Sequence, residues 1–180
     1  MLTWLIKNRL AAFERTFDYD MSYARDILAA DRKAFFAFAR AQRLSRYRKD
    51  VPPEVLLAAG LTAIIAEDCG PCTQLGISMA LAEGIPARTI AAIVSGDTSA
   101  MSAEVALGAE FARAVLARTP AADDLREQIV ARWGQRALVS IAFAITMSRF
   151  YPTLKYALGH GRACQRVVVA GEPIVVRGVA

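Results

Sequence analysis

The sequence is poor in the residues that hold metals and disulfide scaffolds. It contains three cysteines and one histidine among 180 residues. An odd set of three cysteines is too small for a disulfide framework. Cys164 and His160 lie far along the chain from Cys69 and Cys72, so we expect no metal site. Flavin and nucleotide motifs are also lacking, and we therefore expect no cofactor.

The sequence also lacks an apolar run long enough to cross a bilayer. The longest apolar stretches, Val55–Ala66 and Ala137–Met147, fall well short of the roughly 20 residues that a membrane span needs. The apolar N-terminus precedes Lys7 and Arg9, which is the reverse of a secretory signal. We therefore expect a cytoplasmic protein without stable membrane insertion.

Positively charged residues are only in modest excess over negatively charged ones. The chain carries 22 basic and 17 acidic residues, which gives a net charge of +5. Many of the basic residues lie between Arg40 and Lys49. Because such a run is more typical of a solvated helix face than of a binding surface, we expect no nucleic-acid partner.

Strand-like alternation is almost absent, and this predicts an all-α fold. Apolar residues recur three and four apart, with proline, glycine and acidic residues as boundaries. The spacing predicts helices over Leu2–Thr16, Tyr23–Ala30, Lys33–Ser45, Glu54–Ala66, Cys72–Glu83, Ala87–Ser95, Ala103–Arg118, Asp123–Trp133 and Ala137–Phe150. At Tyr151-Pro152 we expect a turn into a last helix that ends near Gly159. Only Val167–Val179 favours a short hairpin or an extended tail.

A pair of prolines divides the chain. Val51-Pro52-Pro53 marks a break, because a double proline can open a helix but cannot continue one. We expect a single globular unit with three parts. Residues 1–50 form an N-terminal helical extension, residues 51–164 form the main helical domain, and residues 165–180 form a short extended C-terminal tail, which we take as an appendage.

The motif Cys-Gly-Pro-Cys is the strongest chemical signal in the sequence. Cys69 and Cys72 are three residues apart, so at a helix start both sulfurs lie on one side, near enough for a disulfide. Pro71 suits the first turn of that helix, where unpaired amides and the helix dipole stabilise a thiolate. We expect a redox-active dithiol. The alternatives are an inert buried pair and half of a zinc site.

An acidic residue beside the motif is a candidate for proton transfer. Glu67 precedes Cys69 by two residues and could accept or return a thiol proton, with Asp68 as the competing choice. Alternatively, both residues only supply negative charge at a helix junction. Our candidate catalytic residues are Cys69, Cys72 and Glu67.

The residues around the motif carry a family resemblance. The stretch EDCGPCTQLG at Glu67–Gly76, followed by ALAEGIP at Ala80–Pro86, resembles the carboxymuconolactone decarboxylase family and its alkylhydroperoxidase D-like members. The similar region covers roughly Val51–Cys164 and includes the order of the predicted helices. The resemblance implies an alkylhydroperoxidase D-like helical bundle, a dithiol activity related to peroxides, and assembly into a homo-oligomer.

The chain departs from that family at two positions. Family members carry a proton-relaying histidine four residues after the second cysteine and a glutamate twelve residues before the first. This sequence has Gly76 and Leu57 there. Because both relay residues are missing, peroxidase-type turnover should be slow.

These observations favour a thiol–disulfide oxidoreductase. One thiolate would attack a peroxide or a partner disulfide, and the other would close a Cys69–Cys72 disulfide. An external thiol reductant would then reset the pair, consistent with an antioxidant role. Two alternatives stay open: a non-catalytic oligomeric binding protein of the same fold, and a carboxymuconolactone decarboxylase-like enzyme.

We predict that the protein is a homo-oligomer. A helical chain of this length with 55% apolar residues carries more hydrophobic surface than one core readily buries. The amphipathic N-terminal helices between Leu2 and Ser45 offer a surface to a neighbouring copy. Light scattering in detergent-free buffer should therefore give a mass above that of one chain. A stable monomer would contradict this, and dispersal only with lipid or detergent would indicate membrane attachment instead.

Overall fold

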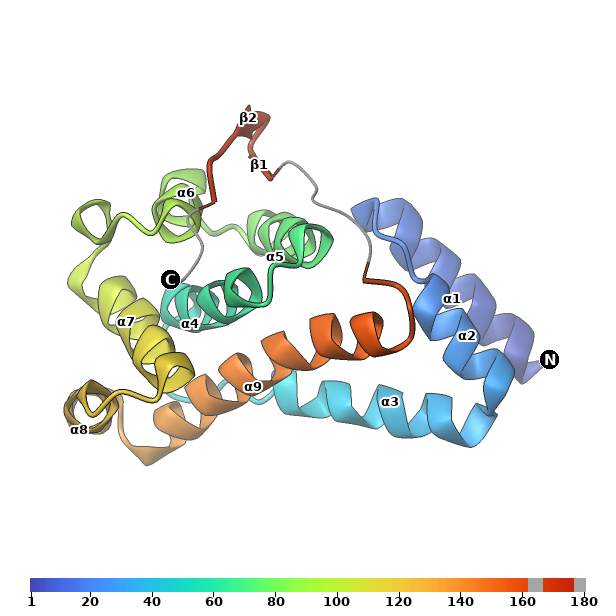
Figure 1. Cartoon of the computed structure of the whole chain (residues 1–180), viewed down its shortest axis with the longest axis horizontal. Coiled ribbons are helices and arrows are strands. Elements are labelled where there is room, and N and C mark those ends of the chain that lie inside the picture. The colour runs from blue at the N-terminus through green and yellow to red at the C-terminus, as the bar shows by residue number, and fades with distance from the viewer. Residues whose placement is uncertain (162–166, 177–180) are drawn as a thin grey trace.

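The computed structural model describes residues 1–161 and 167–176, and this part of the chain is almost entirely helical (Figure 1). The all-α class predicted from the sequence is confirmed. The elements are α1 (Leu2–Phe17), α2 (Ser22–Ala30), α3 (Arg32–Ser45), α4 (Pro53–Ala66), α5 (Gly70–Ala82), α6 (Ala87–Ser95), the 3-10 turn η1 (Thr98–Ala100), α7 (Ala103–Ala117), α8 (Ala121–Trp133), α9 (Gln135–Ala157), β1 (Val168–Val169) and β2 (Glu172–Pro173).

Helix α4 lies at the centre of the arrangement, between α7 and α9 (Figure 1). It is apolar on nearly every side, so it is stable only where other helices enclose it. Two glycines allow the close packing. A Cβ at Gly108 of α7 would lie 2.8 Å from the Val55 carbonyl oxygen, and a Cβ at Gly60 would lie 3.1 Å from Ser148 Oγ of α9.

Three clusters of buried residues form the core. The first joins α4, α5, α6 and α7, with Leu61, Ile77 and Ile90 among its members. The second joins α4 to α7, α8 and α9 around Ile129 and Ile141. The third joins α1, α2 and α3 to α5 and the C-terminal part of α9. Residues before and after the double proline are therefore packed together.

The third cluster is rich in aromatic rings. Phe38 of α3 stacks on Phe150 of α9 with 6.3 Å between ring centroids, and it meets Tyr23 and Tyr151 edge to face. Such pairs add specific geometry to the burial of apolar area. The outer side of α1 stays exposed, with the side chain of Trp4 62% accessible. The N-terminal helices thus pack on their own chain and still present apolar residues outward.

The prediction of a break at Tyr151-Pro152 is wrong. Helix α9 is continuous over its 23 residues and contains Pro152. Proline inside a helix removes one hydrogen bond and costs roughly 3 kcal/mol. The compensation is tertiary, because Pro152 is buried and its neighbours Phe150, Tyr151 and Leu154 pack against the third cluster. Local propensity is overridden by this packing.

The C-terminal segment is a hairpin that belongs to the core. Val169 pairs with Glu172, and the two turn residues Ala170 and Gly171 both have positive φ, as a tight two-residue turn requires. Val169 is buried against the first cluster together with Val167, which directly precedes β1. The hairpin alternative is therefore confirmed for residues 167–176, but the expectation of an appendage is wrong.

A glutamine fixes the hairpin to the rest of the chain. Gln74 of α5 accepts a hydrogen bond from the Val168 amide at 2.8 Å and donates one to the Val168 carbonyl at 3.0 Å. These two bonds satisfy backbone groups of a short strand that would otherwise need water. The hairpin consequently covers α5 just beyond its first turn.

Although the apolar stretch Ala137–Met147 is too short for a membrane span, helix α9 as a whole is, by length and composition, long and apolar enough to cross a membrane. The same property is found in core helices of folded domains, and α9 packs against α3, α4 and α8. Length and composition alone are therefore weak evidence for a span.

We predict that Gly108→Ala destabilises the protein. Alanine would gain about 1 kcal/mol of helix propensity, but the clash of its Cβ with the Val55 backbone should cost about 1–3 kcal/mol. Gly60→Ala is the matched comparison, because the Ser148 hydroxyl can rotate away. Urea denaturation should show a lower midpoint for Gly108→Ala than for Gly60→Ala. Equal or greater stability of Gly108→Ala than of the native protein would contradict the close contact.

Candidate functional site

The two cysteines lie at a tight junction between α4 and α5. Helix α4 ends at Ala66, and Asp68 takes a left-handed conformation with φ of 50°. Aspartate tolerates this region better than most residues. Cys69 is then the residue that caps α5, and its carbonyl oxygen accepts a hydrogen bond from the Thr73 amide at 2.9 Å. The junction therefore directs Cys69 and the first turn of α5 toward α9.

The two sulfurs are joined in a disulfide. Cys69 and Cys72 have 5.2 Å between their Cα atoms, which lies within the usual range for disulfides. Cys69 is half-buried, whereas Cys72, one turn further into the helix, is only 5% exposed. The pair lies at the start of α5, where the helix dipole favours negative charge on sulfur. Cys69 is thus the sulfur that an external molecule reaches.

A cavity of about 350 Å³ opens beside Cys69. It lies between the α4–α5 junction and the C-terminal end of α9, and Gly161 is also part of its lining. Its lining includes Cys69, Pro71, Lys155 and His160. The cavity therefore places one sulfur of the pair next to two groups that can carry protons.

A tyrosine from the N-terminal helices contacts the buried sulfur. The Tyr19 hydroxyl lies 3.7 Å from Cys72 Sγ, within range of a weak hydrogen bond to sulfur. Tyr19 lies in the turn between α1 and α2, and Glu14 in the last turn of α1 binds the residues that follow this tyrosine. The Glu14 carboxylate accepts hydrogen bonds from the Met21 amide and the Arg25 guanidinium, and the contact with Arg25 lowers the pKa of Glu14. This ion pair holds the turn that carries Tyr19.

A buried lysine completes the arrangement. Lys155 of α9 is 5% exposed, and its Nζ donates a hydrogen bond to the Tyr19 hydroxyl at 3.2 Å. The ammonium also lies over the Tyr19 ring, 4.6 Å from its centroid, and 5.6 Å from that of Tyr23. Burial lowers the pKa of Lys155, and the negative charge of Asp20 acts in the opposite direction. Burial raises the pKa of Tyr19 to about 12.

Glu67 lies at the rim of the cavity but is held by other partners. Arg149 Nε donates to Glu67 Oε1 at 2.5 Å, and the Thr153 hydroxyl donates to Oε2 at 3.3 Å. Both carboxylate oxygens thus bind α9. This geometry matches the simpler alternative from the sequence, in which Glu67 supplies negative charge at a helix junction.

His160, which we assigned no role from the sequence, also lines the cavity. Its Nε2 lies 2.8 Å from Asp26 Oδ2 and its Nδ1 lies 3.0 Å from Ser22 Oγ, so the ring ties the end of α9 to α2. Cys164 lies outside the described residues. Within residues 1–161 and 167–176, no three His, Cys, Asp or Glu side chains are placed to hold a metal ion.

Gly76 and Leu57, at the positions where the family that the sequence resembles carries its relay histidine and glutamate, both lie against core residues. A Cβ at Gly76 would lie 2.8 Å from Leu61 Cδ2 and 3.6 Å from Ile64 Cδ1. Leu57 packs against the first core cluster. A histidine side chain at position 76 therefore has no space unless Leu61 moves.

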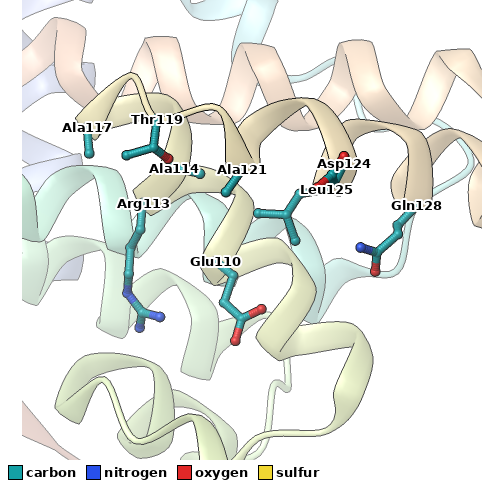
Figure 2. Close-up of a pocket in the computed structure, with 9 residues that line it drawn as sticks. All are labelled: Glu110, Arg113, Ala114, Ala117, Thr119, Ala121, Asp124, Leu125 and Gln128. Atoms are coloured by element: carbon teal, nitrogen blue, oxygen red, sulfur yellow. The ribbon is translucent and has the colours of Figure 1, made fainter.

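A second, larger hollow is an open groove between α7 and α8 (Figure 2). Its volume is about 560 Å³, and its polar side chains include Glu110, Arg113, Asp124 and Gln128. Figure 2 shows that Glu110 and Arg113 extend from α7 while Gln128 extends from α8. The groove contains neither cysteine nor histidine, and the dithiol is not part of its lining.

Comparison with family models, curated proteins and solved structures gave no match for this chain. The function of the protein must therefore be inferred from the site itself.

Sequence reasoning singled out Cys69 and Cys72 but neither Tyr19, which contacts Cys72, nor Lys155, which contacts Tyr19. A basic residue near a helix C-terminus is accounted for by the helix dipole, so Lys155 gives little functional signal in the sequence. The signal that distinguishes it is its setting in FYPTLKYAL, where a lysine interrupts an otherwise uncharged stretch. Tyr19, between Asp18 and Asp20, gives no comparable signal.

We predict that the two thiols of the reduced protein differ in accessibility. Cys69 lines the cavity and Cys72 is buried, so a bulky maleimide should label Cys69 several-fold faster. Peptide mapping by mass spectrometry after brief labelling measures the ratio. The same mapping after urea unfolding is the control, in which the difference should vanish. Faster labelling of Cys72 in the folded protein would refute the assigned orientation.

Proposed function

We propose that this protein is a thiol–disulfide oxidoreductase whose redox centre is the Cys69–Cys72 pair. The observation that carries the proposal is the disulfide at the start of α5 beside a cavity that Cys69 lines. A structural disulfide would need neither a neighbouring cavity nor one sulfur accessible from it. The alternative of an inert pair does not account for either feature.

The proposed cycle uses the two sulfurs in different roles. The Cys69 thiolate attacks one sulfur of a disulfide substrate, and the other substrate sulfur leaves as a thiolate. The Cys72 thiolate then attacks Cys69 Sγ, closing the internal disulfide and releasing the second substrate sulfur. Two electrons pass from the dithiol to the substrate. An external thiol reductant returns them by the same steps in reverse.

Disulfides suit this site better than peroxides as substrates. Cleavage of a peroxide releases an alkoxide or hydroxide, which needs a strong proton donor at the attacked sulfur, whereas a thiolate is a good leaving group. Gly76 and Leu57 leave the family relay positions without a proton donor. Hydroperoxides are therefore the slower substrates in this proposal.

Helices α4–α9 are proposed to form an alkylhydroperoxidase D-like bundle. The support is the order of elements: a buried helix, the Cys-x-x-Cys junction, a helix followed by Gly84, a short helix, a loop and then a long helix. The proposed homo-oligomer would use apolar residues that the single chain leaves exposed, including Leu2, Trp4 and Leu5 of α1.

We predict that Cys72→Ser and Cys69→Ser each abolish a reversible two-electron oxidation. Either change removes one partner of the disulfide, while serine fits in place of cysteine and leaves the helices intact. Titration in thiol–disulfide buffers, followed by alkylation and mass spectrometry, measures the oxidised fraction.

Cys164→Ser is the matched control for these variants and should keep the transition. Far-ultraviolet circular dichroism checks that each variant is folded. A native protein whose disulfide cannot be reversibly reduced would refute the oxidoreductase. Strong destabilisation by Cys72→Ser without a native redox transition would support a buried structural pair.

A further inference from the structure

The buried sulfur has its own chain of hydrogen-bonding groups, which reaches the cavity beside Cys69 through Lys155. Tyr19 and Lys155 come from segments far apart in the sequence, yet the Tyr19 hydroxyl contacts Cys72 Sγ and Lys155 Nζ contacts that hydroxyl. Each is only 5% exposed. Two polar groups buried together next to a reactive sulfur need an explanation beyond packing.

The direction of the hydrogen bonds follows from the chemistry of the atoms. The sulfur of a disulfide carries no hydrogen, so in the Tyr19–Cys72 contact the phenol is the donor. Lys155 Nζ in turn donates to the Tyr19 oxygen. The chain of donors therefore runs from Lys155 through Tyr19 and ends on Cys72 Sγ.

A lysine is costly to bury, and Lys155 lacks the usual compensation. Buried ammonium groups are generally paired with carboxylates. In the part of the chain that the structure describes, the salt bridges do not include Lys155. Its charge is met by the Tyr19 hydroxyl and by the rings of Tyr19 and Tyr23. Such a buried site favours the neutral amine of Lys155 over the ammonium, so the ammonium gives up its proton more readily than an exposed lysine does.

We infer that Tyr19 and Lys155 are the proton relay of Cys72, an inference that rests on the proposed dithiol activity. When a reductant thiolate attacks Cys69 Sγ, the sulfur–sulfur bond breaks and Cys72 leaves as a thiolate. The Tyr19 O–H stabilises that thiolate and passes it a proton, which the Lys155 ammonium replaces. In the oxidising direction, the Cys72 thiol loses its proton through Tyr19 to the Lys155 amine, and the thiolate then attacks Cys69.

The Lys155 end of the relay lies at the cavity beside Cys69, where solvent is accessible. Lys155 also lines the cavity beside Cys69, so protons can be exchanged there without passing Cys72. Tyr19 touches the reacting sulfur and is the catalytic residue in this inference, whereas Lys155 acts through Tyr19 and is a positioning residue. Both cysteines are thereby connected to one cavity, Cys69 directly and Cys72 through two side chains.

Other titratable groups face the relay from each neighbouring element. Asp20 lies next to Tyr19, and its charge favours the protonated form of Lys155. Tyr23 of α2 and Tyr151 of α9 are both buried phenols whose pKa is raised by burial. Because burial raises the pKa of these phenols, they stay neutral, and Lys155 and the cysteines are the groups of the relay that exchange charge.

The first test measures the protonation of Cys72 alone. In the full-length protein with Cys69→Ser and Cys164→Ser, Cys72 is the only cysteine, and NMR of its labelled Cβ carbon reports the thiol–thiolate midpoint. We expect Tyr19→Phe to raise that midpoint by about one pH unit, a tenfold change, because the thiolate loses a charge-assisted hydrogen bond. Lys155→Met should shift the midpoint in the same direction.

The second test uses the protein with all cysteines present. Tyr19→Phe and Lys155→Met should slow closure of the internal disulfide about tenfold near pH 7, and raising the pH should restore the rate. Tyr47→Phe is the matched control, since Tyr47 packs on Phe143 away from the dithiol. Its closure rate and pH profile should equal those of the native protein.

The outcomes separate the relay from the activity on which it rests. If the single variants unfold, Tyr19→Phe combined with Lys155→Met removes both partners at once and avoids an unpaired buried group. An unchanged Cys72 midpoint and pH profile in these variants, with redox cycling intact, would overturn the relay alone. A native protein that cannot cycle would overturn both proposals, and the redox titration detects that before any variant is compared.

Discussion

The enclosure of α4 is the constraint on which the rest of the structure depends. This helix is apolar on nearly all sides, so α7 and α9 must cover it, and the glycines at 60 and 108 let them approach closely. Once the distance between α4 and α9 is fixed, the residue that ends α4 must lie opposite the last turns of α9. Glu67 meets Arg149 there, and Cys69 meets the cavity that Lys155 lines. The position of the dithiol is therefore a consequence of core packing.

Most of the helices could be predicted from the sequence, because the local spacing of apolar residues and the residues at helix boundaries indicate them. Two features could not be. Pro152 continues α9 because burial of the residues around it outweighs the lost hydrogen bond, and that burial is supplied by α1–α3. The hairpin at residues 167–176 is part of the core because Gln74 binds its backbone, a contact that spans 94 residues of sequence. Both depend on distant partners that periodicity does not encode.

The residues of the candidate site also fall into two groups: those that the local sequence indicates and those that only distant contacts bring together. Cys69 and Cys72 could be recognised because their spacing and the proline between them are local. The groups behind Cys72 could not, since Tyr19 is 53 residues from Cys72 and Lys155 is 136 residues from Tyr19. Glu67 was predicted as a proton acceptor from its nearness in sequence, and in the structure its carboxylate binds Arg149 and Thr153 of α9.

In the proposed relay, the contact of Tyr19 with Cys72 also gives the N-terminal helices a part in the chemistry. Burying Lys155 and Tyr19 disfavours folding, and the aromatic cluster of α2, α3 and α9 supplies compensating burial around them. Because linkage between sites is reciprocal, a phenol that favours the reduced Cys72 thiolate is itself held more firmly when that thiolate forms. The proposed relay would therefore couple the redox state of the pair to the packing of α1–α3 on α9 through one hydroxyl group. An extension that only covered the core would have no such coupling.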